Sequence, residues 1–174
     1  MTRRLSVEER RAEILDAATT TFASLPYGEV SAQLIAQRCG VSEGLIFHYF
    51  GSKAGLYAAF LQDTAFDFTR FRDPVELVRA YLDHIAARPF VWAAGRRSGE
   101  EPLEAIHLRI EHRDAAVHTL CELLGRSDER ARIAASGTLG FLDAVALDWV
   151  DEGCPASRRE LLIDATLAAL NAAC

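Results

Sequence analysis

The chain has 174 residues, of which 50% are apolar, and its formal net charge is −6 at pH 7. This length allows one or two small domains, and the apolar content is sufficient for a buried core. No uninterrupted apolar run approaches the roughly 20 residues of a membrane-spanning helix. The N-terminal sequence MTRRLSVEERR lacks the apolar segment of a secretion signal. We therefore expect a cytoplasmic protein that makes no contact with a membrane.

The acidic excess lies outside the N-terminal third of the chain. Residues 1–53 have six basic and six acidic side chains, whereas the remaining residues have thirteen basic and nineteen acidic ones. A neutral N-terminal part with clustered arginines can bind phosphates while an acidic part faces away from them. The charge distribution therefore permits binding to DNA, but it is not an argument for it.

The four cysteines lie far apart along the chain and match no metal-binding or redox spacing; they are Cys39, Cys121, Cys154 and Cys174. Because thiols are normally reduced in the cytoplasm, we interpret them as small apolar residues. A redox-sensing cysteine is an alternative that the sequence leaves open. We expect no bound cofactor and no metal site.

Helical periodicity dominates the sequence, and strand patterns are nearly absent. Apolar residues recur at helical spacing and predict a first helix over residues 7–24. Two short helices then follow within residues 31–50. They are joined at Gly40, whose backbone can adopt the left-handed conformation. Ser31 and Ser42 are suitable N-caps for these two helices.

The rest of the chain is also helical in pattern. Ser52 is the N-cap of a fourth helix, and Asp73-Pro74 begins a fifth, since proline suits the first turn. The predicted ranges are 53–71, 74–87, a short segment from 88, 103–124, 128–152 and 157–173, with a solvated loop over 96–102. The predicted fold is all-α with about nine helices. It has a three-helix N-terminal domain over residues 1–53 and a helical C-terminal domain over residues 54–174.

The second of the two short helices has an unusual surface. Ile46 and Phe50 lie four residues apart and form its buried side, whereas Phe47, His48 and Tyr49 lie on its other faces. A helix of two turns is not stable alone, and this one exposes more aromatic surface than a solvated helix does. Both features are typical of a helix-turn-helix whose second helix enters the major groove of DNA. The alternative is a helical hairpin whose aromatic side chains belong to the core.

The order of features over SAQLIAQRCGVSEGLIFHYFGSK favours the first interpretation. Ile-Ala is followed by Gly-Val-Ser, a glycine, an aromatic-rich tail and Ser-Lys at the start of a helix. With the upstream RRAEILDAATTTFA and the downstream GSKAGLYAAF, residues 10–60 resemble the tetracycline-repressor (TetR) family of bacterial transcriptional regulators. Beyond residue 60 the resemblance is limited to length and helical layout. It implies a repressor that binds a palindromic operator as a homodimer and is released by a small-molecule effector.

The resemblance also suggests which side chains face DNA. It implies a contact of Lys53 with the phosphate backbone and a hydrogen bond between Tyr49 and a phosphate. The family usually has threonine and tyrosine where this chain has Leu45 and Phe47, so two hydroxyls are missing. Apolar side chains in the major groove favour thymine methyl groups; alternatively, Leu45 packs inward. The candidate DNA-binding residues are Ser31, Ser42, Glu43, Gly44, Leu45, Phe47, His48, Tyr49 and Lys53.

Two further groups of residues follow from the expected homodimer and effector. One short helix contacts only a few base pairs, and a symmetric dimer lets two such helices bind one palindrome. Small and apolar residues of the last two helices are the candidate dimer interface: Gly137, Gly140, Leu142, Ala144, Val145, Trp149, Leu161, Leu162, Ala165, Ala168 and Ala169. Aromatic and histidine residues are the candidate effector site: Phe60, Tyr81, His84, Phe90, Trp92, His107 and Phe141. For both groups the alternative is an intramolecular core.

Two other functions are compatible with parts of the sequence. His107 and Glu111, like His118 and Cys121, have the helical spacing of half a metal site, but neither pair completes a set of ligands. The sequence has no nucleophile elbow, phosphate loop or paired-carboxylate motif, so we predict that the chain is not an enzyme. The remaining alternative is a DNA-binding protein without an effector, which organises the nucleoid or binds a protein partner.

Overall fold

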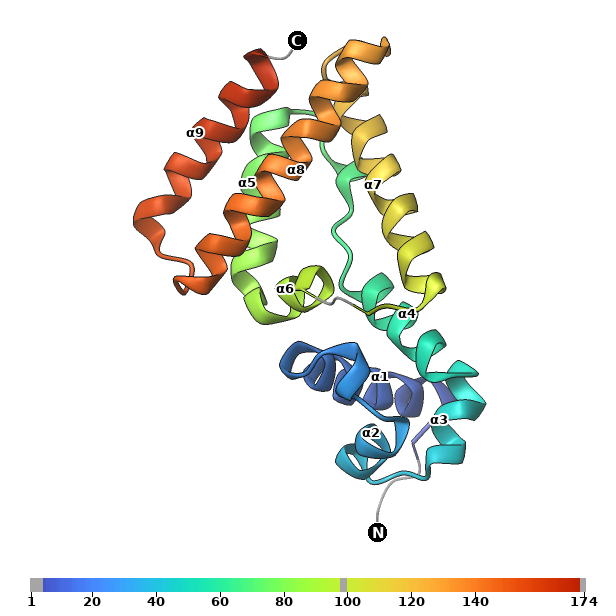
Figure 1. The fold of residues 1–174 in the computed structure, drawn as a ribbon. Helices are drawn as coiled ribbons and strands as arrows, with labels where there is room; N and C mark the ends of the chain where they lie inside the picture. Colours follow the sequence, from blue (N-terminus) through green and yellow to red (C-terminus); the bar gives the residue numbers. More distant parts are fainter. Residues whose placement is uncertain (1–4, 98–99, 173–174) are drawn as a thin grey trace. The chain divides into compact units, whose positions relative to one another are not determined.

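The computed structural model describes residues 5–97 and 100–172, and these residues form nine α-helices and two 3₁₀ helices without a β-strand (Figure 1). The elements in chain order are α1 (Val7–Ser24), η1 (Tyr27–Glu29), α2 (Ala32–Cys39), α3 (Glu43–Phe50), α4 (Lys53–Asp63), η2 (Phe68–Arg70), α5 (Pro74–Ala87), α6 (Pro89–Arg97), α7 (Leu103–Leu123), α8 (Glu129–Asp151) and α9 (Ala156–Ala172). The all-α class predicted from the sequence is confirmed. Cys174 lies outside the described residues.

Local hydrogen bonds explain where several helices begin. α1 starts with a capping box, in which the Ser6 hydroxyl accepts from the Glu9 N–H at 3.1 Å and the Glu9 carboxylate accepts from the Ser6 N–H at 2.8 Å. Asp73 caps α5 with Pro74 in its first turn, and Asp128 caps α8. Since these signals act over three residues, the sequence predicted the starts of these helices closely.

The described residues divide into two compact units. The first extends to Ala65 and includes Phe90–Arg109, and the second consists of Phe66–Pro89 and the residues from Ile110 onward. This division differs from the predicted boundary after residue 53, because all of α4 and all of α6 except Pro89 belong to the first unit. Leu56, Tyr57 and Phe60 of α4 are buried in one core with Ile14, Phe22, Ile35 and Ile46, which explains why α4 belongs there.

The fourth helix ends earlier than predicted. The pattern predicted a helix from Lys53 to Phe71, whereas α4 ends at Asp63. The Thr64 hydroxyl donates to the Phe60 carbonyl at 2.8 Å, and Asp67 accepts from the Thr69 N–H at 3.0 Å to start η2. Side-chain bonds of this kind compete with the helical hydrogen bonds. The prediction of one continuous helix was therefore wrong.

In the second unit, α5, α8 and α9 pack side by side (Figure 1). The Trp149 indole on α8 is buried and donates to the Pro155 carbonyl at 3.0 Å, which fixes the turn into α9. By length and composition alone, α8 is long and apolar enough to cross a membrane. Its buried side chains pack within the unit, as those of a core helix do.

Candidate nucleic-acid interface

The turn between α2 and α3 is held by backbone geometry. Gly40 has φ 65° and ψ 33°, the left-handed conformation that glycine adopts without a steric penalty. The next residue, Val41, donates its N–H to the Ala36 carbonyl at 3.0 Å, which closes the end of α2. Ser42 then accepts from the Leu45 N–H at 3.3 Å and starts α3. The described geometry is that of a helix-turn-helix.

The exposed face of α3 consists of few residues. Ile46 is completely buried, whereas Glu43, Gly44, Phe47 and His48 are exposed. The Phe47 side chain is 41% exposed, which is a large fraction for an aromatic ring on a helix of two turns. Phe47 and His48 are therefore exposed to solvent on α3, the second helix of the helix-turn-helix. This is the helix that we expect to enter the major groove of DNA.

Three other side chains of α3 lie partly inward. Leu45, Tyr49 and Phe50 are half-buried and pack against the core of the first unit. Phe50 was expected on the buried side, and the Arg11 guanidinium lies 4.9 Å from the centre of its ring. The inward packing of Leu45 agrees with the alternative stated for it above. Contact with thymine methyl groups is therefore expected first of Phe47.

Serine hydroxyls lie at the starts of both helices of the motif. The Ser31 hydroxyl accepts from the Leu34 N–H at 3.0 Å, and Ser42 caps α3 in the same way. Because each oxygen accepts the backbone bond, the hydroxyl proton stays available for donation. Both serines are exposed.

The positive charges near the motif have partners within the protein. The Lys53 ammonium donates to the carbonyls of Tyr27 and Val30, each at 2.9 Å. It also lies 3.9 Å from the centre of the Tyr27 ring, and burial lowers the pKa of Lys53. Arg38 donates to the Thr21 hydroxyl at 2.9 Å. Sequence spacing did not reveal these contacts, because the partners lie 17 to 26 residues away.

The candidate effector residues do not form one cluster within either unit. Four of them lie in the first unit: Phe60 and Trp92 are buried, whereas Phe90 and His107 are exposed. Three lie in the second unit: the rings of Tyr81 and His84 both contact Phe66, and Phe141 is 38% exposed on α8. Phe60 is a core residue of the first unit, which agrees with the alternative stated for these aromatics.

One polar cluster of the first unit has no signal in the sequence. The buried Tyr57 of α4 donates its hydroxyl to the Glu101 carboxylate at 2.9 Å, and the Arg109 guanidinium of α7 pairs with the same oxygen. The Nε atom of Arg109 is buried without a hydrogen-bond partner. Because Tyr57 and Glu101 are 44 residues apart, no local pattern could have predicted this link between α4 and α7.

The candidate dimer residues separate into two groups. Leu142, Trp149 and Leu162 are buried in the core of the second unit, which agrees with the alternative of an intramolecular core for these residues. The others are exposed or half-buried on α8 and α9: Gly137, Gly140, Ala144, Val145, Leu161, Ala165, Ala168 and Ala169. Ile133 of α8 is 66% exposed and was not among the predicted interface residues. It lies four residues before Gly137, and this spacing places both residues on one face of the helix.

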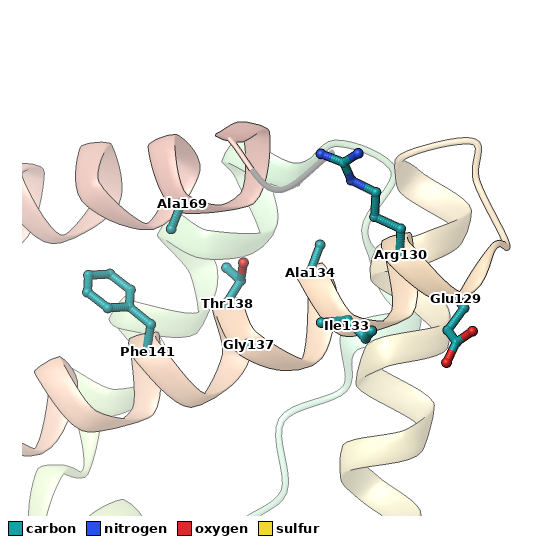
Figure 2. A pocket seen from close by; sticks show the side chains of 8 residues that line it. All are labelled: Glu129, Arg130, Ile133, Ala134, Gly137, Thr138, Phe141 and Ala169. Carbon is teal, nitrogen blue, oxygen red and sulfur yellow. The ribbon is translucent and has the colours of Figure 1, made fainter.

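Figure 2 shows this face of α8, where a groove of about 700 Å³ lies beside Ala169 of α9. Its lining includes Ile133, Gly137, Thr138 and Phe141. A Cβ atom added at Gly137 would meet no atom within 4 Å, so the groove is open at that point. The second unit therefore has an apolar groove flanked by small residues.

Comparison with known proteins relates the N-terminal part of the chain to one family. Residues 14–60 match the family model described as bacterial regulatory proteins, tetR family. The HTH-type transcriptional regulator UidR of Escherichia coli K12 is 37% identical over 76 residues, which cover 43% of this chain. The match spans only 38% of UidR. The regulator BetI of Burkholderia mallei is 28% identical over 89% of each chain.

Solved structures share the fold over nearly the whole chain. A tetR-family transcriptional regulator from Streptomyces coelicolor superposes with a TM-score of 0.77 at 25% identity, covering 97% of this chain and 83% of that one. NalD of Pseudomonas aeruginosa superposes with a TM-score of 0.79 at 18% identity, covering 94% and 97% of the two chains. UidR and the Streptomyces coelicolor protein are both described as transcriptional regulators. Residues 14–60 of the chain thus match the tetR family of bacterial regulatory proteins, and the fold of nearly the whole chain is similar to that of a tetR-family regulator.

Proposed function

We propose that the chain is a DNA-binding transcriptional regulator that binds a palindromic operator as a homodimer and is released by a small-molecule effector. The observation that carries the proposal is the exposed face of α3, where Phe47 and His48 lie beside Gly44 on a helix fixed by the Gly40 turn. An α-helix fits the major groove, and a residue without a side chain allows close approach to the bases. Such a regulator acts in the bacterial cytoplasm.

The proposed contacts divide into two kinds. Ser31, Ser42 and Tyr49 would donate hydroxyl hydrogen bonds to phosphates and fix the register on the duplex. The positive ends of α2 and α3 add to this, since helix N-termini attract anions. Phe47 and His48 would contact base edges, and Phe47 favours thymine methyl groups there. The Glu43 carboxylate, beside them, would be repelled by phosphates. It would instead accept a hydrogen bond from the amino group of a cytosine.

A homodimer would bring two such helices to one palindrome. The exposed apolar side chains Ile133, Phe141 and Leu161 support this proposal, as does the apolar groove of Figure 2. Small residues at Gly137 and Gly140 would let helices of two protomers approach closely. In this arrangement the recognition helices would lie about 34–36 Å apart, which is one turn of DNA.

Release by an effector requires a link to the DNA-binding helices. The Tyr57–Glu101–Arg109 cluster is the proposed link, because it joins α4 to the first turns of α7 within one unit. An effector that displaced the start of α7 would then move α4. It would need to favour the displaced state by a few kcal/mol to release DNA. The fold is shared with NalD, which is the secondary repressor of a multidrug efflux pump in Pseudomonas aeruginosa, and this supports repression.

A binding experiment tests the proposal. Fluorescence anisotropy with duplex DNA from upstream of the chain's own gene should show binding that a scrambled duplex does not reproduce. Phe47→Ala and His48→Ala should each weaken specific binding about tenfold, whereas Val75→Ala, an exposed change on α5, should leave it unchanged. Binding that survives both α3 variants would refute the assignment of α3 to the major groove.

A further inference from the structure

Lys53 is the only lysine of the chain, and its ammonium is directed into the protein. It is the first residue of α4 and is half-buried. An ammonium has three protons to donate, and here the Tyr27 and Val30 carbonyls accept from it at 2.9 Å each. The face of the Tyr27 ring lies beneath the same ammonium, with 3.9 Å between Nζ and the ring centre.

The two carbonyls lie at the start of the helix-turn-helix. Tyr27 begins η1, and Val30 is buried directly before Ser31, the N-cap of α2. The Tyr27 carbonyl also accepts from the Val30 N–H at 3.3 Å. One ammonium therefore ties the first turn of α4 to two residues of the segment that leads into α2.

We propose that Lys53 is a positioning residue, which fixes the start of α2 against α4, and that it is not a ligand of the DNA phosphate backbone. This inference rests on the proposed function, because the position of α2 matters only if the motif binds DNA. A phosphate could accept at most the third proton, and it would compete with two carbonyls and a ring. Burial lowers the pKa of Lys53, in agreement with a site less hydrated than an exposed phosphate contact.

The salt dependence of DNA binding separates the two roles. Lys53→Met keeps the length of the side chain but removes the charge and the donors. For a positioning residue, the variant should bind the upstream duplex roughly tenfold more weakly at every salt concentration, with an unchanged slope of log K against log[salt]. Loss of a phosphate contact would instead reduce the slope by about 0.9 per contact.

The control is Arg96→Met, which removes a cation 4.0 Å from the centre of the Trp92 ring on α6 and should leave both affinity and slope unchanged. All variants are measured at a temperature where circular dichroism shows them to be fully folded. A reduced slope for Lys53→Met would overturn the proposal. So would an unchanged affinity, because a merely structural lysine would lower the melting temperature without changing the binding of the folded protein.

A second measurement uses the wild-type chain. Selective ¹³C and ¹⁵N labelling of lysine gives one side-chain signal, because the chain has one lysine. The Hε protons should be shifted upfield by the Tyr27 ring in the free protein, and they should stay there when the upstream duplex is added. Random-coil shifts, or a large change on adding duplex, would overturn the proposal. If the wild-type chain binds no duplex, the proposed function fails, while the upfield shift still tests the contact itself.

Discussion

Gly40→Ala tests whether the helix-turn-helix is fixed by backbone conformation. Gly40 has φ 65°, and an added Cβ would meet no atom within 4 Å. The cost is therefore conformational rather than steric. A left-handed conformation costs an L-residue about 1–2 kcal/mol, and alanine recovers about 0.4–1 kcal/mol by restricting the unfolded chain. The expected net loss in free energy of unfolding is about 1 kcal/mol.

Gly44→Ala is the matched control, because it makes the same chemical change four residues later. Gly44 lies inside α3, and its added Cβ would also meet no atom within 4 Å. Alanine is the better residue within a helix by about 0.5–1 kcal/mol, so this variant should be more stable than the wild type. Its methyl group would nevertheless lie on the exposed face of α3, where we expect it to weaken DNA binding.

The assay is thermal unfolding followed by circular dichroism at 222 nm. For a chain of this length, 1 kcal/mol corresponds to a shift in melting temperature of roughly 2–4 °C. We expect a decrease for Gly40→Ala and an increase for Gly44→Ala. Shifts of the same sign, or a Gly40→Ala variant as stable as the wild type, would refute the argument from the left-handed turn.

Three further predictions concern other parts of the chain. Tyr57→Phe keeps the buried ring but removes its hydrogen bond to the Glu101 carboxylate, and should lower the free energy of unfolding by about 1–3 kcal/mol in urea titrations. Ile133→Asp should convert a dimer to a monomer in sedimentation velocity without loss of helix, whereas Val75→Asp should not. The Ala131 N–H, and then Arg126, lower the pKa of Asp128. The resulting stabilisation is present above the ordinary pKa and is lost as the pH falls through the lowered one. The difference in melting temperature between the wild type and Asp128→Ala should therefore be constant from about pH 5 to 8 and close below about pH 4.

The features predictable from the sequence were those decided over three to five residues. Ser42 and Asp73 cap helices by bonds to the third residue beyond them, so their positions were visible in the pattern. The end of α4 was decided only partly at that range, through the hydrogen bonds of Thr64 and Asp67, and it also involves distant contacts. The rings of Phe66 and Phe68 lie 5.1 and 5.3 Å from that of Tyr81, and contacts at that sequence separation leave no local periodicity.

The faces of the helices were only partly predictable. Helical spacing placed Ile46 inward correctly, but α8 has apolar residues on two faces. Leu142 faces the core of its own unit, whereas Ile133 and Phe141 are exposed, and the composition of these residues does not distinguish the two faces. The burial of each side chain depends on how α5 and α9 pack against α8. This packing cannot be predicted from a single sequence.

If Lys53 is a positioning residue, the DNA affinity of the motif should depend less on salt concentration than it would with a lysine–phosphate contact. If its charge is used within the protein, as Arg38 uses its charge on Thr21 and Arg11 on Phe50, the described motif contacts phosphates mainly through neutral hydroxyls and helix N-termini. Few counterions would then be released on binding. Since the slope of log K against log[salt] counts those counterions, the described motif should contribute little to that slope. A shallow slope combined with sequence-specific binding would mean that shape and hydrogen bonding, rather than charge, hold this motif on its operator.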